Sequence, residues 1–135
     1  EVGGRRTERQ MELYLRDMYV KSYDVALGRP GHEAPTGLWR VKAGSKLVKP
    51  DWTDPETGRR YTSDDPAYPM GARWIGLKGV GGNAMGRTGF VIHGNKHVND
   101  LGKQPLLTCI ALKNTDVTQL FDMLVPELSE VEVLD

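Results

Sequence analysis

The chain has 135 residues, which is enough for one compact domain with its own hydrophobic core and too few for two. Its 18 basic residues balance 18 acidic ones, whereas nucleic-acid-binding domains normally carry a basic excess, so DNA and RNA are not expected as partners. The single cysteine excludes an internal disulfide, and no apolar run approaches the roughly 18 residues needed to cross a membrane.

The N-terminus is polar and glycine-containing, so we expect residues 1–9 to be a flexible segment that precedes a single domain at 10–135. Its first ten residues lack the apolar stretch of a signal peptide and do not begin with methionine. We therefore expect a fragment or a processed form, and we expect it to be a monomer.

The first predicted element is a β-hairpin. Apolar and polar residues alternate over 10–27 on both sides of a turn near Asp17, which is the pattern of half-buried antiparallel strands. The residues predicted to share the buried faces are Met11, Leu13, Leu15, Tyr23, Val25 and Leu27.

Residues 49–69 contain four prolines and exceed the usual length of a loop. We interpret this segment either as a functional loop or as a small hairpin that turns at residues 54–58. Apolar runs on either side of it predict further strands. These strands are expected at 38–44, 73–77, 89–94 and 129–135.

One short helix is predicted near residues 115–125, because its apolar residues recur at i, i+3, i+4 and i+7. Asn114 or Thr115 is expected to cap the start of this helix, and Pro126 lies just beyond its end. The predicted fold class is therefore mainly β, with one short helix.

A glycine-rich segment resembles a dinucleotide-binding motif, since Gly79, Gly81 and Ala84 fit G-x-G-x-x-A. That motif requires a helix directly after the glycines, within a βαβ unit. Here a strand is predicted to follow at 89–94, which favours a flexible connection. No cofactor is therefore expected.

A zinc site is one reading of the histidines, because His93 and His97 are four residues apart and Asp100 and Cys109 could complete a ligand set. The glycine at position 94 makes a helix over this stretch unfavourable, so the spacing does not bring both rings to one face. We therefore rank a metal site below the next interpretation.

Cys109 lies in the most apolar run of the chain, residues 106–112, and a free cysteine in such a run is usually core. A neighbouring imidazole can instead convert a thiol into a reactive thiolate, and His93 ends the apolar run 89–93. Spacing cannot decide between these interpretations, because cysteine–histidine pairs are neighbours in space rather than in sequence.

Several blocks of sequence, with their order and spacing, resemble the L,D-transpeptidase catalytic domain of the YkuD type. The resemblance extends from about Gln10 to Val133, and the cysteine follows the histidine by sixteen residues. The blocks are APTGLWRV at 34–41, YPMGARWIGL at 68–77, GFVIHGN at 89–95 and KNTDVTQLFDML at 113–124.

The resemblance implies a YkuD-like β-sandwich or barrel of mixed strands that remodels bacterial peptidoglycan outside the cytoplasmic membrane. Cys109 would be the nucleophile and His93 its general base. The backbone N–H groups of Thr108 and Cys109 would form the oxyanion hole. Such enzymes attack the third residue of a stem tetrapeptide and expel the terminal D-alanine. They pass the acyl group to an amine, to water or to a free D-amino acid, and carbapenems typically acylate them.

Four residues are assigned to substrate binding on the same resemblance. Trp52 and Tyr68 lie where the family often carries a segment that covers the substrate, although they could equally pack that loop against the domain. Arg73 could meet a substrate carboxylate, and Gly94 follows the expected base.

An alternative function remains open because the residues around Cys109 differ from the usual family pattern. Leu106 stands where a serine or threonine is usual, Thr108 replaces a glycine, and Ala111 replaces an arginine or asparagine. A catalytically silent relative that binds peptidoglycan stems would tolerate these changes.

Overall fold

The computed structural model describes residues 9–15, 18–25, 34–54, 57–95 and 109–134. These residues form one seven-stranded sheet, one two-stranded sheet, a short 3-10 turn and one α-helix. The strands are β1 (Arg9–Leu15), β2 (Met18–Val25), β3 (Gly37–Leu47), β4 (Trp52–Thr53), β5 (Arg60–Tyr61), β6 (Trp74–Gly81), β7 (Phe90–Asn95), β8 (Cys109–Lys113) and β9 (Glu130–Leu134), the helix α1 spans Asn114–Met123, and the 3-10 turn spans Gly82–Ala84.

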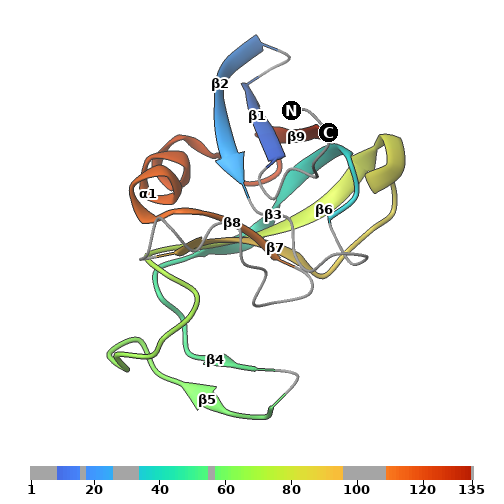
Figure 1. Ribbon diagram of the computed structural model, residues 1–135. Helices are drawn as coiled ribbons and strands as arrows, with labels where there is room; N and C mark the ends of the chain where they lie inside the picture. Colours follow the sequence, from blue (N-terminus) through green and yellow to red (C-terminus); the bar gives the residue numbers. More distant parts are fainter. Residues whose placement is uncertain (1–8, 16–17, 26–33, 55–56, 96–108, 135) are drawn as a thin grey trace, which may run out of the picture.

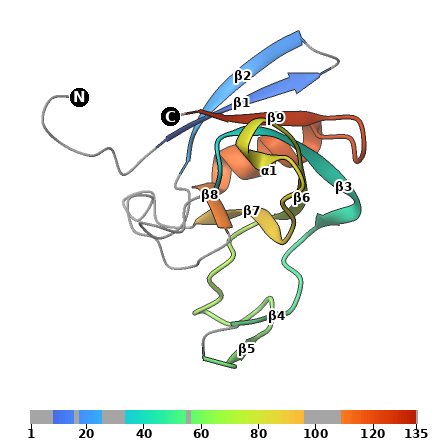
Figure 2. The ribbon, with the colours of Figure 1, turned by 90° about the vertical axis from the view of Figure 1, so that its right-hand side faces the viewer.

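The large sheet has the strand order β2-β1-β9-β3-β6-β7-β8 and curls around α1 (Figures 1 and 2). Neighbouring strands run antiparallel except β7 and β8, which run parallel. The fold is therefore a curled, mixed half-barrel with one helix. This architecture confirms the predicted mainly-β class and the predicted strands.

The core fills the concave side of the curl, where alternate residues of the strands meet one face of α1. Met11, Leu13, Val131 and Val133 are all at most 1% exposed, as the alternation predicts. The predicted burial of Tyr23 and Val25 is also confirmed. The side chain of Leu15 and all of Leu27 lie outside the described residues.

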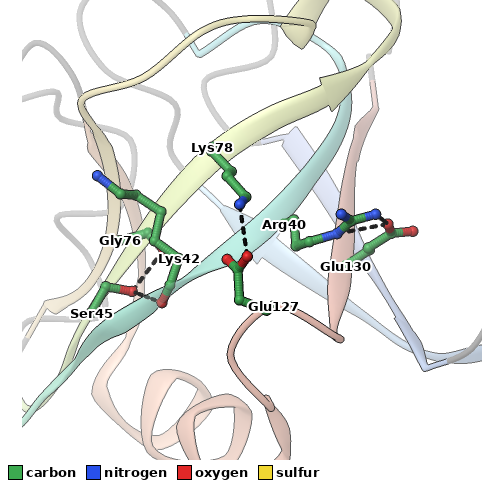
Figure 3. A network of polar contacts seen from close by, with 7 residues as sticks. All are labelled: Arg40, Lys42, Ser45, Gly76, Lys78, Glu127 and Glu130. Carbon is green, nitrogen blue, oxygen red and sulfur yellow. Dashed lines mark hydrogen bonds and ion pairs between the residues drawn. The ribbon is translucent and has the colours of Figure 1, made fainter.

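The strand β3 departs from regular pairing with β6 between Val41 and Lys46, where four residues bulge out. Ser45 closes this bulge, because its hydroxyl lies 2.7 Å from the carbonyl oxygen of Lys42 and 3.0 Å from that of Gly76 (Figure 3). A bulge typically bends the strand that contains it, and β3 leads into the β4–β5 hairpin.

Two partly exposed ion pairs lie on the same part of the sheet (Figure 3). Arg40 Nη2 is 2.7 Å from Glu130 Oε2, and Lys78 Nζ is 2.9 Å from Glu127 Oε1. Pairs with this much solvent contact contribute little to stability. They join β3 to β9, and β6 to the turn before β9.

The helix α1 begins one residue earlier than expected, and the predicted side-chain cap is wrong. Lys113 occupies the N-cap position, and its side chain makes no capping hydrogen bond. Asn114 is the first helical residue, and its Oδ1 accepts a hydrogen bond from the backbone N–H of Ala72, 2.9 Å away. A tertiary contact has therefore replaced the local cap.

The glycine-rich segment forms a closed turn between two strands. Gly79 N–H donates to the carbonyl oxygen of Arg87 at 2.8 Å, and Gly86 N–H donates to that of Gly79 at 3.1 Å. The 3-10 turn leads into β7. The prediction of a strand after these glycines, in place of the helix that a dinucleotide site needs, is confirmed.

Candidate active site

His93 lies in the middle of three adjacent strands. It is directly opposite Trp74 on β6 and Ala111 on β8, and Val91, two residues earlier on β7, is opposite Cys109. Side chains alternate between the two faces of a sheet, so directly paired positions and positions two residues apart share a face. The register positions of His93 and Cys109 are therefore on one face of neighbouring parallel strands.

The offset between these two positions is one diagonal step. A strand spacing of about 4.8 Å and a rise of about 3.3 Å per residue give a diagonal of about 8 Å between their Cα positions. A histidine and a cysteine on one face can span that distance. The side chain of Cys109 is outside the described part of the chain, so the pairing itself stays a prediction.

The His93 ring is only 1% exposed, and its Nδ1 lies 2.8 Å from the carbonyl oxygen of Gly94. A carbonyl oxygen can only accept, so Nδ1 carries the hydrogen and Nε2 is left as the basic nitrogen. Burial lowers the pKa of His93 to about 4, because desolvation disfavours the imidazolium, while the Gly94 carbonyl opposes this more weakly. The ring is therefore neutral at neutral pH.

A second apolar cluster covers the sheet face that carries His93. Tyr68 and Met70 are its buried members, and the partly buried side chains packed against them come from the hairpin and from this face of the sheet. Those partly buried members are Trp52, Tyr61, Trp74 and Val91. The cluster anchors the segment that carries β4 and β5, whose hairpin extends away from the main sheet (Figures 1 and 2).

Aromatic contacts give this segment its internal order. The rings of Trp52 and Tyr61 stack with centroids 6.0 Å apart, and the hydroxyl of Tyr68 donates to the carbonyl oxygen of Pro50 at 2.5 Å. Trp52 and Tyr68 thus pack the loop, which was one of the two predicted roles. Substrate contact by these residues stays a prediction.

Tyr68→Phe is expected to destabilise the domain by about 0.5–1.5 kcal/mol, because it removes one hydrogen bond and keeps the packed ring. Urea unfolding at constant pH measures this change, with Tyr61→Phe as the matched variant in the same cluster. Unchanged stability together with impaired turnover would contradict a packing role and support substrate contact.

The segment that follows Tyr68 is pressed against the end of β7. Gly94 N–H donates to the carbonyl oxygen of Met70 at 3.1 Å, and the Gly94 carbonyl receives the His93 hydrogen bond. A Cβ on Gly94 would lie 2.2 Å from Asn114 Oδ1 and 2.8 Å from Val117 Cγ1, so a larger residue would force both side chains to move. Both main-chain polar groups of Gly94 thus have partners within the protein, and its predicted role in substrate binding stays a prediction.

A pocket of about 350 Å³ lies beside this junction, between the hairpin segment and the start of α1. Its charged residues, Lys49, Asp64 and Asp65, lie in the long segment at 49–69 and were not predicted as site residues. That segment has no helical or strand periodicity, and its unusual length was the only sign in the sequence of a functional loop. The lining residues are Lys49, Ser63, Asp64, Asp65, Pro66, Tyr68, Gly71, Ala72 and Asn114.

Arg73, the predicted contact for a substrate carboxylate, is held against α1. Its Nη1 donates to the carbonyl oxygen of Ala72 at 2.8 Å, and its guanidinium lies 5.2 Å from the centre of the Phe121 ring. Its Nε is buried and has no hydrogen-bond partner among the described residues. The proposed contact with substrate therefore stays a prediction.

Several predicted site residues lie outside the described ranges, namely Thr108, His97 and Asp100. Over the described residues, no group of three potential ligands could hold a metal ion, but the zinc interpretation depends on positions beyond them. The same part of the chain contains no helix that is long and apolar enough to span a membrane.

Three curated relatives align with most of the chain. They are named as L,D-transpeptidases: YkuD of Bacillus licheniformis (26% identical over 93% of this chain), ErfK/SrfK of Escherichia coli (29% over 86%) and YqjB of Bacillus subtilis (31% over 83%). The chain spans 59%, 37% and 58% of the lengths of these relatives.

A solved structure, that of Bdellovibrio bacteriovorus Bd1075, has a similar fold with a TM-score of 0.56. It is 14% identical, and the match covers 94% of this chain and 46% of the Bd1075 chain. The family model of the L,D-transpeptidase catalytic domain, YkuD, matches residues 5–133. The chain therefore belongs to the YkuD family of L,D-transpeptidase catalytic domains.

Proposed function

We propose that this domain is an active L,D-transpeptidase that acts on peptidoglycan stem peptides through an acyl group carried on Cys109. The strand register carries the proposal, because it gives Cys109 and His93 positions on one face of adjacent strands. The tautomer of His93 supports it as well, since Nε2 is the nitrogen left to accept a proton. Family membership supplies the reaction class.

In the proposed reaction, the Cys109 sulfur attacks the carbonyl carbon of the third stem residue while the thiol proton passes to His93 Nε2. The backbone N–H groups of Thr108 and Cys109 stabilise the oxyanion. The peptide C–N bond then breaks, and His93 returns the proton to the amine of the departing D-alanine. An amine of a second stem attacks the thioester, which forms a new peptide bond and regenerates the thiol.

The neutral state of His93 leaves Nε2 able to accept the thiol proton, and the low pKa at the same time makes the buried ring a weak base. An imidazole accepts a proton only when it is unprotonated, and burial keeps this ring unprotonated across the neutral range. Because the proposed substrate lies outside the cytoplasmic membrane, we place the working protein there.

The experiment is acylation by a carbapenem followed by intact-mass measurement. We expect one adduct on the wild type and none on Cys109→Ala, because Cys109 is the only cysteine of the chain. His93→Gln is expected to slow acylation by about 10²–10⁴-fold, which is the usual contribution of a positioned general base. A product with the mass of two stem tetrapeptides less one D-alanine residue and one water would then establish the crosslinking reaction, whereas a free tripeptide would show hydrolysis.

A wild type that forms no adduct, with a thiol that also reacts slowly with a small alkylating reagent, would contradict this proposal. That result would favour the silent relative that binds stem peptides.

A further inference from the structure

The side chain of Asn114 lies where three segments meet: the start of α1, the segment at 70–72 and the end of β7. Its Oδ1 accepts the backbone N–H of Ala72 at 2.9 Å. The same oxygen lies 2.5 Å from where a Cβ of Gly71 would be and 2.2 Å from where a Cβ of Gly94 would be. It therefore sits directly against both glycines.

The segment held by Asn114 in turn holds Gly94. Met70 accepts the Gly94 N–H at 3.1 Å, and a Cβ on Gly71 would lie 2.3 Å from the Gly94 carbonyl carbon and 2.4 Å from its oxygen. Gly71 has φ +67, a conformation that favours glycine and allows this approach. The Gly94 peptide group is thus packed against the segment at 70–72.

The Gly94 carbonyl is the acceptor that fixes the hydrogen of His93 on Nδ1. Its orientation follows from the packing on Gly71 and from the hydrogen bond to Met70. A small rotation of this peptide group would weaken the bond to Nδ1 and allow the hydrogen to move to Nε2.

We propose that Asn114 is a positioning residue for His93: by holding the segment at 70–72 against Gly94, it keeps His93 in the tautomer with a free Nε2. The inference rests on the proposed function only in that Nε2 is the atom expected to take the Cys109 proton. Asn114 directly follows β8, the strand that begins with Cys109. Residues 109–114 therefore contain both the proposed nucleophile and the residue that positions His93.

The test reads the tautomer directly, by heteronuclear NMR that correlates the imidazole ring protons with both ring nitrogens. His93→Gln assigns the His93 signals. We expect the wild type to show the Nδ1–H tautomer and Asn114→Ala to show a mixture with Nε2–H. Asn114→Asp retains the acceptor oxygen and is expected to restore the wild-type tautomer. Thr115→Ala, at an exposed position on the same turn, is expected to leave the tautomer unchanged.

Acylation provides a second readout. We expect Asn114→Ala to slow carbapenem acylation by about 10–100-fold, with Asn114→Asp and Thr115→Ala near the wild-type rate. If Asn114→Ala does not fold, Asn114→Ser replaces it, because a serine at this position is too short to reach Ala72.

A folded Asn114→Ala or Asn114→Ser variant that keeps the pure Nδ1–H tautomer of His93 would overturn the inference. The two proposals fail separately. If the wild type forms no adduct but the tautomer of His93 still depends on Asn114, the transpeptidase proposal is wrong and the positioning role is confirmed. If the wild type and all Asn114 variants have the same tautomer and are acylated at the same rate, the positioning role is wrong and the transpeptidase proposal stands.

Discussion

The stability of this domain is expected to fall by roughly 2–4 kcal/mol as the pH drops from about 6.5 to about 4, because of His93 alone. Burial lowers the pKa of this ring from 6.5 to about 4 in the folded state. Between these values the unfolded chain binds the proton and the folded chain does not, so protonation favours unfolding. The contribution is fully present above pH 6.5 and is lost as the pH falls toward 4.

Urea unfolding of the wild type and of His93→Gln at a series of pH values measures this effect. His32 and His97 are present in both proteins, so the difference between the two profiles isolates His93. Glu127 and Asp64, whose pKa values are lowered by hydrogen bonds from Lys78 and Thr62, also titrate in both. Two profiles that remain parallel between pH 7 and 4 would show that the His93 ring is not buried as described.

Most of the strands could be predicted because one buried face leaves a period of two in the sequence. Val131 and Val133 show this plainly: both are buried, and their neighbours Glu130 and Glu132 are half-buried. An apolar run at 89–94, rather than this alternation, predicted the strand that carries His93. Neither pattern could predict that β8 runs parallel to β7, because no local pattern records the direction of a strand that pairs across a long connection.

His93 and Cys109 were predicted as site residues from their residue types and from the family resemblance. Only the strand register showed that their positions share one face of the sheet. What surrounds His93 was not predictable. Asn114 carried the signal of a helix cap, yet its oxygen bonds Ala72, which is distant in the sequence. An asparagine that caps a helix and one that bridges two segments look the same in a sequence, because the same short amide makes both bonds.

Residues 70–72 approach β7 closely, and this contact distinguishes two glycines with similar positive φ angles. Gly71 has φ +67 and Gly58 has φ +75. No atom of the described residues lies within 4 Å of a Cβ built on Gly58, whereas a Cβ on Gly71 would lie 2.3 Å from a backbone atom of Gly94. Gly58→Ala is therefore strained only in its backbone, which costs about 1–2 kcal/mol. Gly71→Ala carries the same strain together with a backbone overlap, which typically adds about 1–3 kcal/mol.

Urea unfolding of the two alanine variants gives the difference between them, and hydrogen exchange at the Gly94 amide shows where it arises. We expect Gly71→Ala to be the less stable variant by at least about 1 kcal/mol, and to lose protection at the amide that donates to Met70. Equal destabilisation with normal protection would mean that the segment can lift from β7 without cost. In that case Gly94, and through it the tautomer of His93, would not depend on this packing.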